Sequence, residues 1–332
     1  MTYRFGRCGI GVIKGLLTAG VLCANAAAQV GTVAFPSKPV QVIVPFPPGG
    51  SVEVEARLYT QKLSDNTGRP FIMDYRPGAG TTIALGQLVK SPRDGHAIMV
   101  VSSGLTLAPA LYRDLPFDPI KGIAPITLLS KRANLLLVHP SLPPRTATEY
   151  LAYLRSNPGQ LNYGTPGPGT SGHLSGVLLH NLSKTVVTYV HYKGTGAMMP
   201  DLLAGRVHAT ATTFISGMPH VKTGKLRLLA VTADKRLSIL PEVPTLAEQG
   251  VAGYEHSGWL GVATVAGTPP EYVRRLHEEL VKAGKAPEVS RKLGEEGAVV
   301  VLNSPEEFRQ FLNIEVTTWA KVAREAGLKA ED

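Results

Sequence analysis

Cysteine is almost absent from this chain of 332 residues, and both cysteines lie near its start. Cys8 and Cys23 fall within a segment in which two arginines precede an apolar run from Gly9 to Leu22. A basic start, an apolar stretch and a small-residue end are typical of a secretory signal peptide. We expect a signal peptide over residues 1–28, which leaves the mature protein without a disulfide, a thiolate nucleophile or a cysteine metal ligand.

Long uncharged apolar runs are also missing. The run near the start contains Lys14, and the longer uncharged stretches that follow are interrupted by glycine, proline and polar residues, unlike the roughly 18 apolar residues of a membrane span. Cleavage after Ala26 or after Ala28 satisfies the small-residue rule, and we favour Ala28. A lipoprotein attached at Cys23 is the less favoured alternative, because the bulky Leu22 precedes it. We therefore expect an exported, periplasmic protein.

Acidic residues are outnumbered by basic ones. The chain has 34 Lys plus Arg against 25 Asp plus Glu, and the expected signal peptide carries three of the basic residues and no acid, which leaves +6. The excess is scattered along the chain, so it lacks the clustered basic face of a nucleic-acid binder. Attraction of a small anion and simple solubility both account for it, and we expect no nucleic-acid partner.

Strand and helix patterns alternate along the chain. The apolar run between Pro39 and Pro45 predicts a buried parallel strand, and Ser51 opens a helix after a glycine turn. The same order recurs with predicted strands at 71–74, 97–102, 135–138, 161–163, 186–190, 208–212 and 226–231. About 300 mature residues exceed what one core organises. We predict an α/β protein with two lobes.

Glycine and hydroxyl residues recur where a strand hands over to a helix. Three such turns are Gly49-Gly50-Ser51, Gly78-Ala79-Gly80-Thr81-Thr82 and Gly167-Pro168-Gly169-Thr170-Ser171-Gly172, and a fourth patch is Ser102-Ser103-Gly104. The first amides of a helix lack partners and the helix dipole is positive there, so such turns attract anions. An ordinary capped helix is the alternative for any single turn. Their recurrence in both halves favours one shared anion pocket.

Several catalytic and cofactor readings fail on context. Gly167, Gly169 and Gly172 match a dinucleotide fingerprint, but no acid follows within 20 residues to bind a ribose. No nucleophile elbow surrounds Ser171, so a serine hydrolase is a minor alternative. His173 and His180, seven residues apart, could share a helical face and bind a metal, but no third ligand has suitable spacing, so a surface or capping pair is favoured. We expect no cofactor, no metal and no enzymatic activity.

Blocks of residues throughout the mature chain resemble the Bug-type receptors of tripartite tricarboxylate transporters. They include Pro36-Ser37-Lys38-Pro39, Val44-Pro45-Phe46-Pro47-Pro48-Gly49-Gly50, Arg76-Pro77-Gly78-Ala79-Gly80, Leu161-Asn162-Tyr163-Gly164, Tyr192-Lys193-Gly194, Asp201-Leu202-Leu203-Ala204-Gly205 and Pro241-Glu242-Val243-Pro244-Thr245. The resemblance implies a two-lobed periplasmic-binding-protein architecture of the type II or flytrap class. It places lobe 1 at 35–130 plus 234–332 and lobe 2 at 131–233, with crossings near 129–135 and 231–234.

In that family, backbone amides and ordered water at the glycine turns hold the ligand carboxylate. The resemblance places the ligand contacts at Phe46, Gly50, Ser51, Glu53, Ala79, Gly80, Ser102, Ser103, Thr170, Ser171 and Tyr192. Some positions depart from the family pattern. Glu53 stands where an aspartate is usual, Tyr75 replaces an asparagine, and Thr213 and Phe214 fall where an acid is frequent.

The resemblance implies a monomeric solute-binding protein that presents a small carboxylate to membrane transporter subunits. A sensory subunit that contacts a signalling partner is the alternative that the sequence leaves open.

Overall fold

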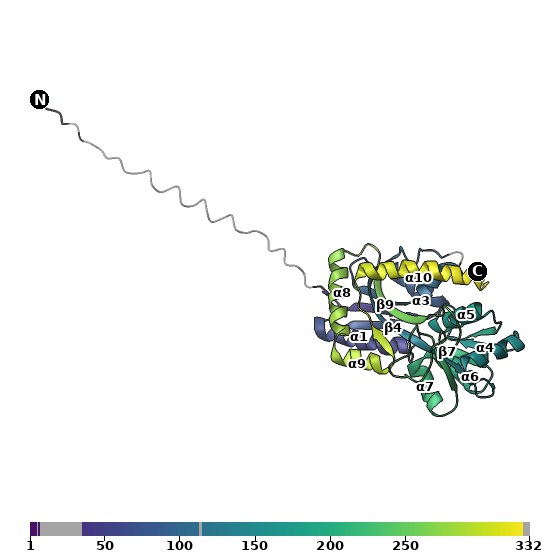
Figure 1. Cartoon of the computed structure of the whole chain (residues 1–332). Helices are drawn as coiled ribbons and strands as arrows, with labels where there is room; N and C mark the ends of the chain where they lie inside the picture. The colour runs from purple at the N-terminus through teal and green to yellow at the C-terminus, as the bar shows by residue number, and fades with distance from the viewer. Residues whose placement is uncertain (5, 7–34, 113–114, 328–332) are drawn as a thin grey trace. The chain divides into compact units, whose positions relative to one another are not determined.

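A computed structural model describes residues 1–4, 6, 35–112 and 115–327. Contacts divide the chain at Ala34, and all helices and strands described here belong to residues 35–332 (Figure 1). The expected signal peptide lies almost entirely outside the described residues, as do its alternative cleavage positions. None of the helices in the described ranges is long and apolar enough to cross a membrane.

Strands and helices alternate as predicted. The strands are β1 Val40–Val44, β2 Phe71–Tyr75, β3 Ala97–Ser102, β4 Ile123–Val138, β5 Asn162–Thr165, β6 Thr188–His191, β7 Ala209–Thr213, β8 Arg227–Val231, β9 Ser257–Val265 and β10 Ala298–Val300. The helices are α1 Ser51–Thr67, α2 Thr82–Leu88, α3 Ser103–Leu111, α4 Ala147–Ser156, α5 Ser171–Ser183, α6 Thr195–Leu203, α7 Phe214–Lys222, α8 Pro270–Gly284, α9 Pro287–Glu295 and α10 Pro305–Glu325, with a 3₁₀ turn at Ala79–Thr81.

The strands follow the order β2-β1-β3-β9-β4-β7-β5-β6, and β8 and β10 also pair with β4. Strands β1, β2 and β3 are parallel, as are β5, β6 and β7, while β9 runs antiparallel to β3 and β4. Residues 123–133 of β4 pair with β9, and residues 134–138 pair with β7 and β8. One long strand therefore belongs to both halves of the sheet.

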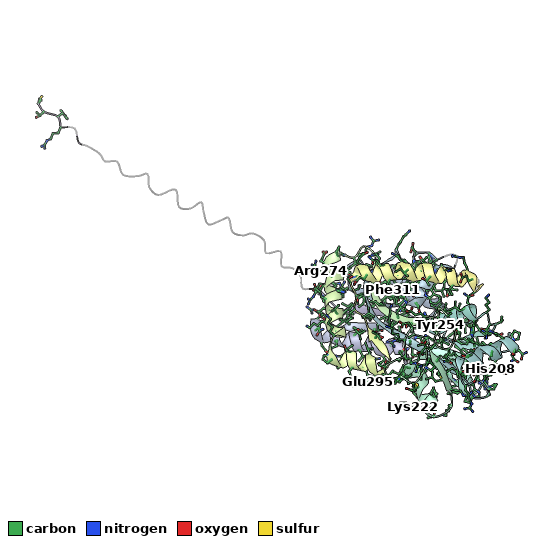
Figure 2. All side chains as sticks on the ribbon, viewed as in Figure 1. His208, Lys222, Tyr254, Arg274, Glu295 and Phe311 are labelled. Atoms are coloured by element: carbon green, nitrogen blue, oxygen red, sulfur yellow. The ribbon has the colours of Figure 1, made fainter. Side chains whose placement is uncertain are left out.

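Each half has its own apolar core on both faces of its strands. In the first half, residues such as Val42, Leu63 and Ile98 pack with Leu280 of α8. In the second half, Tyr150 and Tyr163 pack with strand residues of β4 and β7. In Figure 1, helices α1, α8 and α9 lie on one side of β4, and helices α4, α6 and α7 lie on the other. Figure 2 shows Tyr254 in the second half and the exposed residues Arg274 and Glu295 on the first half.

The carboxy-terminal helix α10 spans the two halves. Phe308 and Leu312 near its start are buried in the first core. Trp319 and Ala323, further along, pack with α3 and with α5 of the second half. The apolar stripe of this helix thus covers the junction between the halves and does not belong to one of them.

The boundary between the halves in the tail remains a prediction, and the packing favours a later return than 231–234. Leu246 and Tyr254 are buried in the second core, and Leu240 packs beside β8. The chain enters the first half again with β9 at Ser257.

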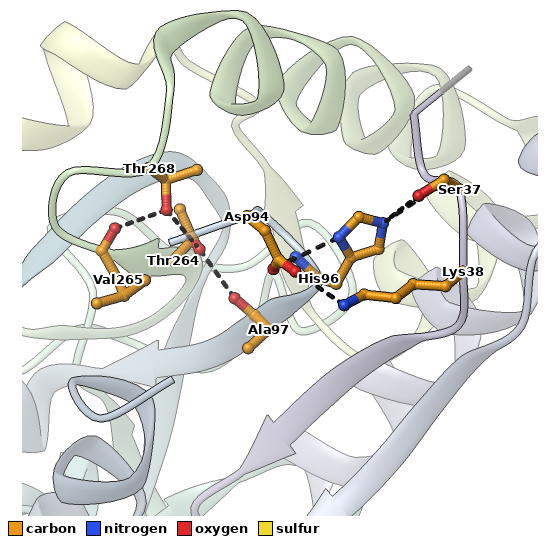
Figure 3. A network of polar contacts seen from close by, with 8 residues as sticks. All are labelled: Ser37, Lys38, Asp94, His96, Ala97, Thr264, Val265 and Thr268. Atoms are coloured by element: carbon orange, nitrogen blue, oxygen red, sulfur yellow. Dashed lines mark hydrogen bonds and ion pairs between the residues drawn. The ribbon is translucent and has the colours of Figure 1, made fainter. Parts of the chain in front are cut away.

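Polar contacts also fasten the segment before β1 to the loop before β3. Lys38 pairs with Asp94 at 2.8 Å, and the backbone nitrogen of Ser37 donates to the Nε2 atom of His96 at 3.2 Å (Figure 3). A neighbouring contact joins Thr264 of β9 to the carbonyl oxygen of Ala97 at 2.8 Å. These contacts fix the outer end of β1, β3 and β9 and leave the opposite end of β1 and β3 for the helix starts.

Candidate functional site

A cavity of about 580 Å³ lies between the two halves, and we refer to it as the central cavity. The first half contributes the segment 46–52, Ser102, Ser103 and residues 258–260. The second half contributes Pro166, residues 170–172, 193–197 and 211–213. The strand ends after β1, β3 and β5 therefore meet at one place, as expected for parallel α/β sheets.

Four helices begin at the central cavity: α1 at Ser51, α3 at Ser103, α5 at Ser171 and α6 at Thr195. No side chain caps the start of α1, α3 or α6. At α5 the Thr170 hydroxyl accepts a hydrogen bond from the His173 amide. Amides without helical partners and the positive ends of four helix dipoles favour a negatively charged ligand here.

The predicted site residues divide into two groups in the structure. Seven of them line the central cavity: Phe46, Gly50, Ser51, Ser102, Ser103, Thr170 and Ser171. Four do not line it: Glu53, Ala79, Gly80 and Tyr192. The first, third and fourth glycine or serine turns therefore converge, which is the arrangement that the shared anion pocket requires.

Two of the remaining side chains are held by neighbours outside the cavity. The Glu53 carboxylate pairs with Arg57 and accepts a hydrogen bond from the Tyr75 hydroxyl at 3.3 Å. The Tyr192 hydroxyl donates to Asp201 at 2.7 Å. Partial burial, together with this hydrogen bond, raises the pKa of Tyr192 to about 12.

The second glycine turn, residues 78–82, does not line the cavity but packs against a helix that does. A Cβ atom at Gly104, the second residue of α3, would lie 2.9 Å from the carbonyl oxygen of Gly80. Only glycine at position 104 allows this approach, so the turn packs directly against the start of α3. Gly80 therefore helps to position the helix start that lines the cavity.

Several cavity residues were not predicted from the sequence. They are Arg132, Asn134, Lys193 and Trp259, together with small residues of the α6 start. Arg132 and Lys193 are the two charged side chains among the described lining residues, and neither Asp nor Glu occurs there. The cavity wall is therefore cationic. Polar residues at 130–132 and 134 interrupt two apolar runs, and they are the one signal in the sequence for this part of the site.

Ser171 is part of a buried polar network at the junction of the halves. Asn134 donates from Nδ2 to the Ser171 hydroxyl oxygen at 2.6 Å, and the Nε2 atom of His256 lies 3.3 Å from the same oxygen. Burial lowers the pKa of His256 to about 4, so its imidazole is neutral at pH 7. Thr232 connects both partners of Ser171. Its Oγ1 atom accepts a hydrogen bond from the backbone N–H of Asn134, and its carbonyl oxygen accepts one from the backbone N–H of His256.

Two α/β halves that share a sheet strand, with a cationic cavity between them, define a two-lobed periplasmic-binding-protein fold. A solved structure from R. palustris, Rpa4515 with adipate, has a TM-score of 0.84 and 34% identity over 90% of this chain and 100% of that chain. MatC (Rpa3494) from Rhodopseudomonas palustris with bound malate has a TM-score of 0.81 and 30% identity, covering 87% of this chain and 99% of that chain.

Sequence comparisons place the chain more narrowly. The model of the tripartite tricarboxylate transporter family receptors matches residues 55–328. BugT of Bordetella pertussis is 31% identical over 318 residues, which cover 95% of this chain and 98% of that protein. The chain belongs to the tripartite tricarboxylate transporter receptor family and is of its Bug type, which confirms the predicted resemblance and the predicted fold class.

Proposed function

We propose that the protein is an exported, periplasmic solute-binding protein that captures a small carboxylate in the central cavity and delivers it to membrane transporter subunits. One observation carries the proposal: four helix starts and two cationic side chains face a cavity whose described lining residues include no acid. The adipate and malate bound by the two solved relatives support a carboxylate as the ligand class.

The proposal includes closure of the two halves around the ligand. A ligand shifts a conformational equilibrium only as far as it prefers one state, so it must contact both halves to favour the closed form. Ser51 and Ser103 lie on the first half and Ser171 on the second, and all three line the cavity.

A thermal-shift and calorimetry panel tests this function. The panel contains dicarboxylates, citrate, amino acids, nicotinate and aromatic acids, with the matching amides as uncharged controls. A carboxylate at 100 times its dissociation constant should stabilise the protein by about 2.7 kcal/mol. If no carboxylate raises the melting temperature at millimolar concentration, the proposed function is wrong.

A Ser171→Ala variant tests whether binding occurs in the cavity. Loss of one hydroxyl donor should weaken carboxylate binding about threefold to tenfold and leave the protein folded. Exposed Thr317→Ala on α10 is a matched hydroxyl control that should bind like the wild type. Equal affinities of the Ser171 variant and the wild type would place the ligand elsewhere.

One contact favours testing hydrolysis as a second function. The distance of 3.3 Å between Ser171 and His256 Nε2 is that of a nucleophile and a base. Asn134 donates to the same oxygen, and within residues 35–112 and 115–327 no carboxylate hydrogen-bonds to His256 to orient it. We therefore infer that His256 positions the Ser171 hydroxyl in the cavity wall and does not act as a base. Turnover of a chromogenic ester that disappears in Ser171→Ala would reverse this conclusion.

Transport and sensing differ in the partner that recognises the closed form. Pull-down from membranes with and without the identified carboxylate separates them, because transporter subunits are expected in one case and a signalling receptor in the other.

A further inference from the structure

Arg132 is a nearly buried cation on the inner side of the central cavity. Only 6% of the residue is exposed, yet it lines the cavity. It lies on β4, between Gly258 of β9 and Ala298 of β10. Its Nη2 atom pairs with the carboxylate of Glu55 on α1, which also accepts a hydrogen bond from the Ser130 hydroxyl at 2.9 Å. The guanidinium is therefore fixed from the side of the first half.

The rest of this guanidinium has no acceptor. Its Nε atom is buried without a hydrogen-bond partner, and the described residues offer no hydrogen-bond acceptor to Nη1. A buried donor without a partner costs free energy, and the cost is greater for a charged group. Nη1 is not among the buried atoms, so an acceptor supplied by a ligand in the cavity can reach it, whereas Nε is closed off from the cavity.

Arg132 stays charged despite its burial. Burial lowers its pKa to about 10, and the nearby Glu296 opposes this shift. The group is thus a cation at neutral pH. A negatively charged acceptor forms a stronger, charge-assisted hydrogen bond with a cation than a neutral acceptor does.

The guanidinium of Arg132 pairs with α1 about one turn beyond the start of that helix. Ser51 and Glu55 are four residues apart on one face of α1, which corresponds to about one turn or 5.4 Å along the helix axis. Ser51 is half-buried whereas Glu55 is completely buried. Ser51 and Arg132 line the same cavity of about 580 Å³, so a ligand whose carboxylate is held by the amides at the start of α1 can place a second polar group near Arg132.

We propose that Arg132, held by Glu55, is a specificity-determining residue that donates the N–H groups of its Nη1 atom to a second acidic group of the ligand. The inference rests on the proposed function, since it concerns the same cavity. A ligand with a single carboxylate at the helix starts leaves the donors of Arg132 unpaired and is disfavoured for that reason.

Ligand pairs that differ only at one end test this inference. Calorimetry compares succinate with succinamate and adipate with its monoamide, so each pair exchanges one carboxylate for an uncharged amide of similar shape. The wild type should bind at least one dicarboxylate tenfold or more tightly than its monoamide, the range expected for a charge-assisted hydrogen bond.

The decisive variant changes both partners. Arg132→Gln alone would leave Glu55 as a buried carboxylate without a counter-ion, which destabilises a fold strongly. The double variant Arg132→Gln with Glu55→Gln avoids this and should reduce the preference for the dicarboxylate to about twofold or less. Glu55→Gln alone removes the paired carboxylate, leaves Glu296 as the nearby acid, and should increase the preference.

An exposed pair of the same composition is the matched control. Arg291 and Glu295 on α9 form an ion pair at 2.6 Å outside the cavity. Their double change to glutamine should leave the preference unaltered.

The possible outcomes separate the proposed role of Arg132 from the proposed binding of a carboxylate. If the Arg132 and Glu55 double variant keeps the wild-type preference, or if the wild type shows none, the role of Arg132 is overturned while carboxylate binding stands. If the wild type binds no carboxylate at all, both proposals are overturned.

Discussion

Asn134 on β4 donates hydrogen bonds from its single side-chain nitrogen to two residues of α5, to Ser171 at 2.6 Å and to Ser175 at 2.9 Å. Asn134 is the residue at which the β4 pairing changes from β9 to β7 and β8. The first turn of α5, which lines the cavity, is therefore attached to the strand at the junction of the two halves.

Asn134→Ala removes both of these hydrogen bonds. Because the side chain is buried, we expect the free energy of unfolding to fall by roughly 2 kcal/mol and carboxylate affinity to fall several-fold. Urea unfolding and calorimetry measure the two effects. Asn181→Ala, at the far end of α5, should change stability by less than about 0.5 kcal/mol. An unchanged carboxylate affinity in the Asn134 variant would show that the hydrogen bond from Asn134 is not needed to position Ser171.

Gly258 of β9 lies against the same serine. A Cβ atom at position 258 would lie 2.4 Å from Ser171 Oγ and 2.8 Å from Ser171 Cβ. Gly258→Ala should therefore displace the start of α5, lower the free energy of unfolding by about 1–3 kcal/mol and weaken ligand binding. Gly294→Ala is the matched control, because a Cβ atom there would meet nothing within 4 Å. Equal stability of the two variants would contradict the packing described here.

Buried histidines predict a stability that depends on pH. Burial lowers the pKa of His256 to about 4 and those of His173 and His180 to about 3. Unfolded imidazoles titrate near pH 6.5, so below that value the unfolded state binds more protons than the folded state. Stability is complete above about pH 6.5 and is lost as the pH falls toward 3. From pH 7 to pH 5 the loss should be on the order of 1–2 kcal/mol for each histidine.

Urea unfolding at several pH values between 5 and 7 measures this slope. His180→Gln should make the slope shallower, whatever it does to stability at pH 7. His220→Gln on α7 tests whether removal of any histidine has the same effect. Identical slopes for the wild type and the His180 variant would exclude a contribution from that histidine.

Tryptophan fluorescence should report ligand binding. The chain has two tryptophans, and Trp259 lines the central cavity whereas Trp319 is buried on α10. Both indole N–H groups donate to Glu315. A bound carboxylate should alter the emission of the wild type and of Trp319→Phe, but not that of Trp259→Phe. A signal that survives in the Trp259 variant would come from movement of α10.

Much of the fold was accessible from the sequence because its signals are local. The predicted strands at 71–74 and 97–102 agree with β2 and β3, and helix α1 begins at Ser51 as predicted. The long strand β4 was predicted only over 135–138. Its middle carries Lys131 and Arg132, and the burial of Arg132 depends on Glu55, far away in the sequence.

The part of the site that is formed by the backbone at helix starts could be predicted from the sequence. Gly50, Ser102 and Ser171 were found because glycine and hydroxyl residues mark helix starts, and those starts converge on the cavity. Arg132 and Asn134 were not found, because their role follows from strand pairing over long sequence distances. The predicted contacts of Glu53 and Tyr192 with a ligand stay predictions, since both side chains are satisfied by protein neighbours.

Strand β4 continues through the junction without a break over Ile123–Val138. A loop at this position would let the halves swing apart by rotation about a few bonds. A hydrogen-bonded strand resists such rotation and yields mainly by twisting and bending along its length. Relative movement of the halves is therefore expected to be of modest amplitude and spread along β4. The strand pairs on either side of Asn134 bend elastically and restore the resting arrangement.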